Sequence, residues 1–234
     1  MNLCQRGKVA IVTGSTKGIG LAIAERLASE GAIVVTTGRS GGAMPLDLRE
    51  TDSAQRLVDY AITTHGRIDI LVNNAGATKR GAFLDLTDAD FADGFALKYF
   101  GAVRLTRAAW PHLQAAGGSV VFISGVGGRT PGAQFTIGGS VNAALLSLTK
   151  ALAELGVRDG VQVNAINPGT IRTERMKARL KSAEDEAAFV RDSKITRIGE
   201  TSDIAALTAF LVSAEGRFLH GALIDADGGA TKTI

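Results

Sequence analysis

The sequence predicts an α/β fold in which a parallel sheet is covered by helices on both faces. Short apolar runs alternate with helical patterns along all 234 residues, an order typical of strand–helix–strand units. No proline- or serine-rich linker interrupts the alternation, and no internal repeat is present. The length and the 45% of hydrophobic residues allow one full core. We therefore expect a single domain over residues 1–234.

The elements follow from the apolar runs and from the helical patterns between them. Strands are expected at Val9–Thr13, Ile33–Thr37, Ile68–Asn73, Ser119–Ser124, Val161–Asn167 and Ala222–Asp225. Helices are expected at Gly18–Ser29, Thr51–His65, Thr87–Ala115, Gly138–Leu155 and Asp203–Leu211.

One connection is too short for the usual pattern. Only Ser40 to Met44 separates the end of the second strand from Pro45-Leu46-Asp47. A parallel crossover normally takes a dozen or more residues and contains a helix. We expect that helix to be missing, and any strand around Ala43–Leu46 to be brief.

The loop from Thr13 to Gly20 carries the strongest functional signal. It joins the first strand to the first helix, so free N–H groups and the positive end of the helix dipole point at one place. Glycines at 14, 18 and 20 let a pyrophosphate approach the backbone. The loop therefore predicts a nucleotide cofactor, without indicating a reaction.

Composition excludes several function classes. The 26 basic and 23 acidic residues leave a net charge of only +3, too balanced to favour nucleic acid. Cys4 is the one cysteine, and the three histidines lack ligand spacing, so neither a disulfide nor a metal site is expected. No signal peptide and no apolar run of roughly 20 residues is present, which predicts a cytoplasmic protein without a membrane span.

Four ordered motifs together resemble the short-chain dehydrogenase/reductase family over almost the whole chain. They are the glycine loop at 13–20, Asn73-Asn74-Ala75-Gly76, Asn167-Pro168-Gly169 with Ile171 and Thr173 beyond it, and Asp225-Ala226-Asp227-Gly228-Gly229. The resemblance implies a Rossmann fold of about seven strands in the order 3-2-1-4-5-6-7 and a nicotinamide cofactor.

The charges near the second strand favour NADP(H) over NAD. Thr37-Gly38-Arg39-Ser40 contains no carboxylate that would repel a 2′-phosphate, and Arg39 and Lys17 can pair with one. Solvated surface charges are the alternative for both side chains. The resemblance further implies that Asp47, beside Leu48, accepts from the adenine amino group. The expected cofactor-binding residues are Gly14, Ser15, Thr16, Lys17, Gly18, Ile19, Gly20, Arg39, Ser40, Asp47, Leu48, Asn74, Ala75, Gly76, Pro168, Gly169, Ile171 and Thr173.

The resemblance implies four catalytic residues: an Asn, a Ser and a Tyr-x-x-x-Lys pair. This sequence departs from that pattern at all four positions. In the register set by the helix around Asn142–Lys150, the Tyr position falls on Gly138 and the Lys position on Asn142. The Ser position falls on Gly125, beside Ser124, and the Asn position on Lys98. The only tyrosines, Tyr60 and Tyr99, have no lysine four residues later.

Lys98, Ser124 and Asn142 are therefore the catalytic candidates. Asn and Lys have exchanged positions, so Lys98 could place an ammonium near the site of the missing lysine and act as an acid. A lysine that only fills vacated space, or that points to solvent, is the alternative.

Three functions remain open at this stage. The leading hypothesis is an NADP(H)-dependent oxidoreductase acting on a small carbonyl or alcohol substrate. A catalytically inactive NADP-binding sensor or partner subunit is the second, and a non-redox enzyme that uses the cofactor is the third.

Two further expectations concern partners. Basic residues where the family carries its substrate lid favour an anionic substrate or a phosphopantetheine-type carrier, with a solvated helix as the alternative. These residues are Arg172, Arg175, Lys177, Arg179 and Lys181. The resemblance also implies a homo-oligomer, either dimer or tetramer, and small residues on the helices near 87–115 and 138–155 favour the tetramer.

Overall fold

The computed structural model describes residues 3–177, 180 and 182–232 and contains one sheet of six parallel strands. Their spatial order is β2-β1-β3-β4-β5-β6. The strands are β1 (Val9–Thr13), β2 (Ile33–Thr37), β3 (Ile70–Asn73), β4 (Ser119–Ile123), β5 (Gln162–Pro168) and β6 (Leu223–Ala226). The predicted doubly wound parallel sheet is confirmed, and each strand lies within three residues of its expected place.

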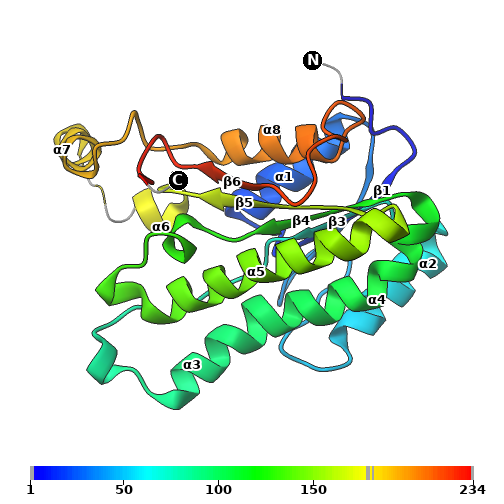
Figure 1. Ribbon diagram of the computed structural model, residues 1–234, viewed down its shortest axis with the longest axis horizontal. Helices are drawn as coiled ribbons and strands as arrows, with labels where there is room; N and C mark the ends of the chain where they lie inside the picture. Colours follow the sequence, from blue (N-terminus) through cyan, green and yellow to red (C-terminus); the bar gives the residue numbers. More distant parts are fainter. Residues whose placement is uncertain (1–2, 178–179, 181, 233–234) are drawn as a thin grey trace.

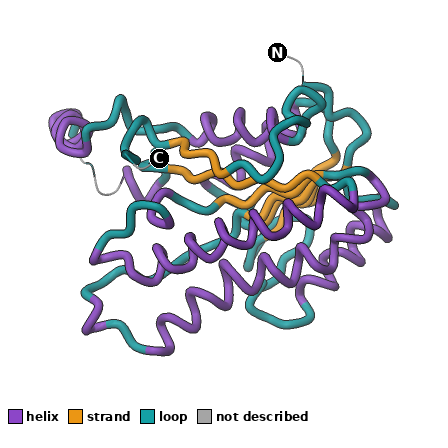
Figure 2. The backbone as a smooth tube through the Cα atoms, in the orientation of Figure 1, coloured by secondary structure: helices purple, strands orange, loops and turns teal. Residues whose placement is uncertain are grey.

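Helices cover both faces of this sheet (Figure 1), because successive residues of each buried strand point in opposite directions. Val9 and Ile11 of β1 pack with helices α2, α4 and α5, whereas Ala10 and Val12 pack with α1 and α8. The helix bounds are α1 Gly18–Ser29, α2 Ser53–His65, α3 Asp88–Phe95, α4 Gly101–Ala116, α5 Thr136–Asp159, α6 Glu174–Lys177, α7 Ala183–Ser193 and α8 Thr201–Leu211. Figure 2 shows the strands as one layer between these helices.

The short second crossover contains no helix, as predicted, and no strand forms around Ala43–Leu46. The chain folds straight back after β2, with one isolated antiparallel bridge between Thr37 and Gly42. Met44 N–H donates to Thr36 O at 3.1 Å, and the Thr37 hydroxyl donates to Met44 O at 2.6 Å. So few residues cannot cross over to add a parallel strand. The sheet therefore has six strands instead of the expected seven.

The long helix expected over Thr87–Ala115 consists of three pieces. Helix α3 is followed by one π-helical turn, η2 (Ala96–Phe100), and then by α4. Thr87 begins α3 with a capping box made with Asp90. A π-helical turn inside a helix rotates the side chains that follow it, and such turns are frequent at functional sites. Helices α6 and α7, which lie beyond the carboxyl end of β5, were not predicted.

Candidate active site

The glycine loop has the geometry that a pyrophosphate needs. Gly14 and Gly18 have φ values of +63° and +58°, which favour glycine. A Cβ at Gly20 would lie 2.3 Å from Gly14 O, so only glycine fits at this close approach. Lys17 precedes α1 and makes no side-chain cap, so no side chain at this position occupies the first N–H groups of the helix. The loop thus fits the phosphates of a dinucleotide cofactor.

The neighbouring loop after β3 holds the glycine loop in place. The Thr13 hydroxyl accepts from both Asn74 N–H and Ala75 N–H, each at 2.9 Å. Asn74 Nδ2 donates to Thr13 O at 2.9 Å and to Gly14 O at 3.2 Å. Ser15 is also committed inside the protein, because its hydroxyl donates to Val12 O at 2.7 Å. Asn74, Ala75 and Ser15, which are three of the expected cofactor residues, therefore shape the cradle through hydrogen bonds within the protein.

The loop after β5 approaches the glycine loop. Gly169 packs against Asp227, where a Cβ would lie 2.7 Å from the Asp227 Cα. The Thr173 methyl group lies 3.8 Å from the position of a Cβ on Gly18. Ile171 is buried and forms an isolated bridge with Gly199. The structure therefore places Thr173 next to the glycine loop and leaves Pro168 inside β5.

The basic residues expected to bind a 2′-phosphate are exposed at the end of β2 and in the glycine loop. Arg39, Ser40 and Lys17 are exposed, and Thr16 packs under Gly38. Asp47 is engaged locally, since its Oδ1 accepts from Arg49 N–H at 3.0 Å, and the Arg49 guanidinium pairs with it. Leu48 is buried in the core.

Lys98 lies in the π-helical turn η2 and reaches the carboxyl end of β4. Its Nζ donates to Ser124 O at 2.7 Å and to Asn142 Oδ1 at 2.6 Å. Its stem lies against Gly76, where a Cβ would be 2.7 Å from Lys98 Cδ. Burial lowers the pKa of Lys98 to about 8, because removing an ammonium from water disfavours its charged form. The three catalytic candidates thus form one cluster.

Ser124 and Asn142 contribute to that cluster in different ways. The Ser124 hydroxyl donates to Asn142 O at 3.1 Å, so the group that serves Lys98 is its main-chain carbonyl. Asn142 is buried in α5, and its Nδ2 lies 2.8 Å from the position of a Cβ on Gly125. The amide therefore needs a glycine there to turn its oxygen toward Lys98.

The sequence analysis did not single out Phe135. A Cβ at Gly138 would lie 2.0 Å from Phe135 Cζ, so this ring fills the space beside the position that the family pattern assigns to tyrosine. The ring comes from three residues earlier, at the end of the 3-10 turn Ala133–Phe135, and carries no hydroxyl. Arg80 lies over it, with Cζ 3.9 Å from the ring centroid. The only sequence feature that could have indicated this arrangement was a small residue at 138 three residues after an aromatic residue at 135.

The expected basic lid is described only in part. Arg172 pairs with Glu186 and with Glu200, and these hydrogen bonds raise the pKa of its guanidinium further. The Arg172 guanidinium is therefore engaged by Glu186 of α7 and by Glu200 at the start of α8. The expected residues Arg179 and Lys181 lie outside the described residues, as do the side chains of Arg175 and Lys177.

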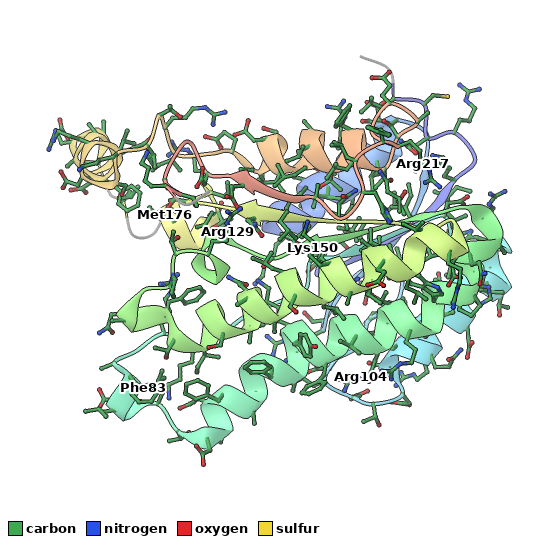
Figure 3. All side chains as sticks on the ribbon, in the orientation of Figure 1. Phe83, Arg104, Arg129, Lys150, Met176 and Arg217 are labelled. Atoms are coloured by element: carbon green, nitrogen blue, oxygen red, sulfur yellow. The ribbon has the colours of Figure 1, made fainter. Side chains whose placement is uncertain are left out.

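A cavity of about 330 Å³ opens beyond the carboxyl ends of β5 and β6. Thr170, Arg197, Asp225 and Gly228 are among the residues that line it. Arg129, labelled in Figure 3, extends from the loop after β4 and pairs with Asp225 at 3.2 Å. Among the described residues, no group of three or more His, Cys, Asp or Glu side chains could hold a metal ion.

The chain is similar to known proteins over nearly its whole length. A family model described as enoyl-(acyl carrier protein) reductase matches residues 14–231. A short-chain dehydrogenase from Burkholderia cenocepacia, solved in complex with NADP, is 32% identical and covers 97% of this chain and 99% of its own, with a TM-score of 0.88. The chain belongs to the short-chain dehydrogenase/reductase family.

Two further proteins match this chain over similarly long stretches. An uncharacterized oxidoreductase of Mycobacterium tuberculosis is 35% identical over 243 residues, covering 96% of this chain and 92% of the relative. L-Sorbose reductase from Gluconobacter frateurii, solved with NADPH and L-sorbose, is 28% identical, covers all of both chains and has a TM-score of 0.89. No helix in the described part of this short-chain dehydrogenase/reductase could span a membrane.

Proposed function

We propose that this chain is an NADP(H)-dependent oxidoreductase that interconverts a carbonyl compound and an alcohol, with Lys98 as the proton donor. The observation that carries the proposal is the Lys98 ammonium, held at 2.7 Å by Ser124 O and at 2.6 Å by Asn142 Oδ1. An ammonium has three donors, so one N–H is left for a substrate oxygen.

The cradle around the glycine loop fits the cofactor. Its N–H groups would hold the pyrophosphate, and Arg39 and Lys17 would pair with a 2′-phosphate. The solved relatives that contain NADP or NADPH support this choice. Bound NADPH would supply a hydride to the carbonyl carbon.

Lys98 completes the reduction by giving a proton from Nζ to the carbonyl oxygen. The alcohol forms, and the neutral amine then takes a proton from solvent. With a pKa of about 8, Lys98 is largely protonated at neutral pH and still able to release its proton. Asn142 acts as a positioning residue, because its side-chain oxygen directs the ammonium.

The phenyl ring next to Gly138 favours a second function. It fills the tyrosine position without any ionisable group, as expected of a member that binds the cofactor and catalyses nothing. A sensor of NADP(H) would keep the cradle and need no proton donor. The homo-oligomer, the small-molecule substrate, the absence of nucleic acid and membrane partners, and the cytoplasmic location stay predictions.

One experiment separates these functions. NADPH binding is titrated first, and NADPH oxidation is then followed with a panel of aldehydes and ketones. In the Lys98→Met variant we expect kcat to fall by about 10²- to 10⁴-fold with unchanged NADPH affinity. Lys150→Met, which removes an exposed lysine from α5, should keep full activity.

Three other results would each argue against a part of the proposed function. NADPH binding without turnover of any substrate would support the sensor. Wild-type kcat in Lys98→Met would remove Lys98 as the donor, and a failure to bind NADPH would refute the cofactor assignment.

A further inference from the structure

The side-chain nitrogen of Lys98 is surrounded by neutral groups. Its two acceptors are the main-chain oxygen of Ser124, 2.7 Å from Nζ, and the side-chain oxygen of Asn142, 2.6 Å from Nζ. Its stem lies against Gly76, where a Cβ would be 2.7 Å from Lys98 Cδ. Burial alone lowers the pKa of Lys98, with no contribution from a carboxylate in the described part of the chain. No negative charge therefore holds the lysine in its ammonium form.

The two hydrogen bonds of Lys98 are compatible with both protonation states of Nζ. An ammonium has three N–H donors and keeps one beyond these two bonds. A neutral amine has two N–H donors, so the two bonds use both of them. Its lone pair then takes the remaining tetrahedral position. The position that presents an N–H to a substrate oxygen in the ammonium form therefore presents a lone pair in the amine form.

The amine form arises in every cycle of the proposed reduction. It exists after Lys98 has given its proton to the carbonyl oxygen and before it takes another from solvent. A buried lysine that loses its charge near neutral pH is a nucleophile that forms Schiff bases with carbonyl compounds. Lys98 is half-buried, so part of its side chain stays in contact with solvent, from which a small carbonyl compound arrives.

We propose that the ε-amine of Lys98 captures small aldehydes as a reversible Schiff base, which makes this position a covalent carbonyl-binding site. The lone pair of Nζ bonds to the carbonyl carbon, and a proton moves from Nζ to the carbonyl oxygen, which gives a carbinolamine. The carbinolamine loses its hydroxyl group and the remaining N–H proton as water and becomes an imine. Addition of water reverses both steps, and no oxidant or reductant is consumed. This inference rests on the carbonyl–alcohol activity proposed above, which brings a carbonyl group to Nζ.

Tight packing around Lys98 favours aldehydes over ketones. Lys98 Cδ leaves no room for a Cβ at Gly76, and Asn142 Nδ2 leaves none at Gly125, where it would lie 2.8 Å away. The reacting carbon of an aldehyde carries a hydrogen where that of a ketone carries a second carbon group. An aldehyde therefore needs less space beside Nζ, and we expect ketones to be captured less readily.

The capture is tested on the protein without NADPH, with butanal as the probe and sodium cyanoborohydride as the trap. Cyanoborohydride reduces the imine to a stable secondary amine, which leaves one butyl group on the labelled lysine. Peptide mapping by mass spectrometry locates the label and separates Lys98 from any α-amino group, which titrates in the same range. At pH 7 we expect Lys98 to be labelled on the order of 10- to 100-fold faster than the exposed Lys150, because more of its amine is neutral.

Two variants separate this capture from general lysine chemistry. Asn142→Asp keeps Lys98 and a side-chain oxygen beside it but adds a negative charge, which favours the ammonium. Labelling of Lys98 by butanal at pH 7 should then fall on the order of 10-fold. A lysine with a merely structural role would not show this loss, because the variant is close in shape to the wild type. Lys150→Met is the matched control and should leave the labelling of Lys98 unchanged.

The trapping result is independent of the proposed reduction, because no cofactor takes part in it. Rapid labelling of Lys98 without any NADPH oxidation would support the capture in a chain that is not a reductase. Aldehyde reduction with Lys98 labelled no faster than Lys150 would overturn the capture and leave the proton donor in place. Equal labelling of Lys98 in wild type and Asn142→Asp would overturn it as well.

Discussion

The cofactor half and the catalytic half of the site are built by different means. Around the glycine loop, position is set by the backbone: left-handed glycines, a missing Cβ at Gly20, and hydrogen bonds between Thr13 and Asn74. Around Lys98, position is set by the Ser124 main-chain carbonyl and the Asn142 side chain, which come from two other segments. A backbone cradle depends on conformation, whereas the proton donor depends on the identity of a few side chains. Substitutions of side chains around Lys98 can therefore leave the cofactor cradle unchanged.

The largest effect is expected in the cofactor half. Gly20→Ala would bring a Cβ to 2.3 Å from Gly14 O, and a backbone carbonyl cannot yield without moving the loop. We expect NADPH affinity to fall on the order of 100-fold, measured by calorimetry.

Gly132→Ala is the matched control for this change. A Cβ at Gly132 meets nothing within 4 Å, and its φ of −115° suits any residue. Wild-type NADPH affinity in Gly20→Ala would show that the close approach does not shape the cradle.

A medium effect is expected from the charge next to Lys98. The reduction needs the ammonium form, so wild-type kcat should fall about tenfold per pH unit above the Lys98 pKa of about 8. Asn142→Asp places a carboxylate at the same position, which favours the charged form and raises that pKa by about one to three units.

The pH profile of carbonyl reduction checks this prediction. The falling limb should move to higher pH in Asn142→Asp and should be absent in Lys98→Met combined with Asn142→Asp. A limb that stays near pH 8 in Asn142→Asp would assign the titration to another group.

The smallest effect tests how Phe135 fills the space at Gly138. Gly138→Ala should destabilise the protein, because its Cβ would lie 2.0 Å from Phe135 Cζ. In a Phe135→Ala background that conflict is gone, so the two changes should couple by about 1 kcal/mol or more in urea unfolding of the four proteins. Additive free energies of unfolding would mean that the ring moves aside freely.

The sequence predicted most of the fold because β1, β3, β4 and β5 are fully buried runs made largely of apolar residues. The missing crossover helix was also predictable, since five residues cannot contain it. The break at Ala96–Phe100 was not, because a π-helical turn leaves no periodic signal distinct from a continuous helix.

The candidate site, like the fold, was predicted from the sequence only in part. Motif spacing located Lys98, Ser124 and Asn142, which the structure brings together. Spacing does not say where the side chain three residues before Gly138 will lie, so Phe135 was missed. The charge count of the lid was also misleading for Arg172, because its partners Glu186 and Glu200 are distant in sequence.

The chain that folds back after β2 has a consequence for how the molecule meets its neighbours. β2 is the outermost strand on its side of the sheet, and an open edge invites strand addition from another chain. The returning segment already uses Thr36 O and Gly38 O as acceptors for Met44 and Leu46. What stays open is the start of β2 around Ile33, which is 46% exposed. So short an edge offers too few hydrogen bonds for a stable intermolecular ladder. The returning segment after β2 therefore disfavours aggregation through this edge of the sheet.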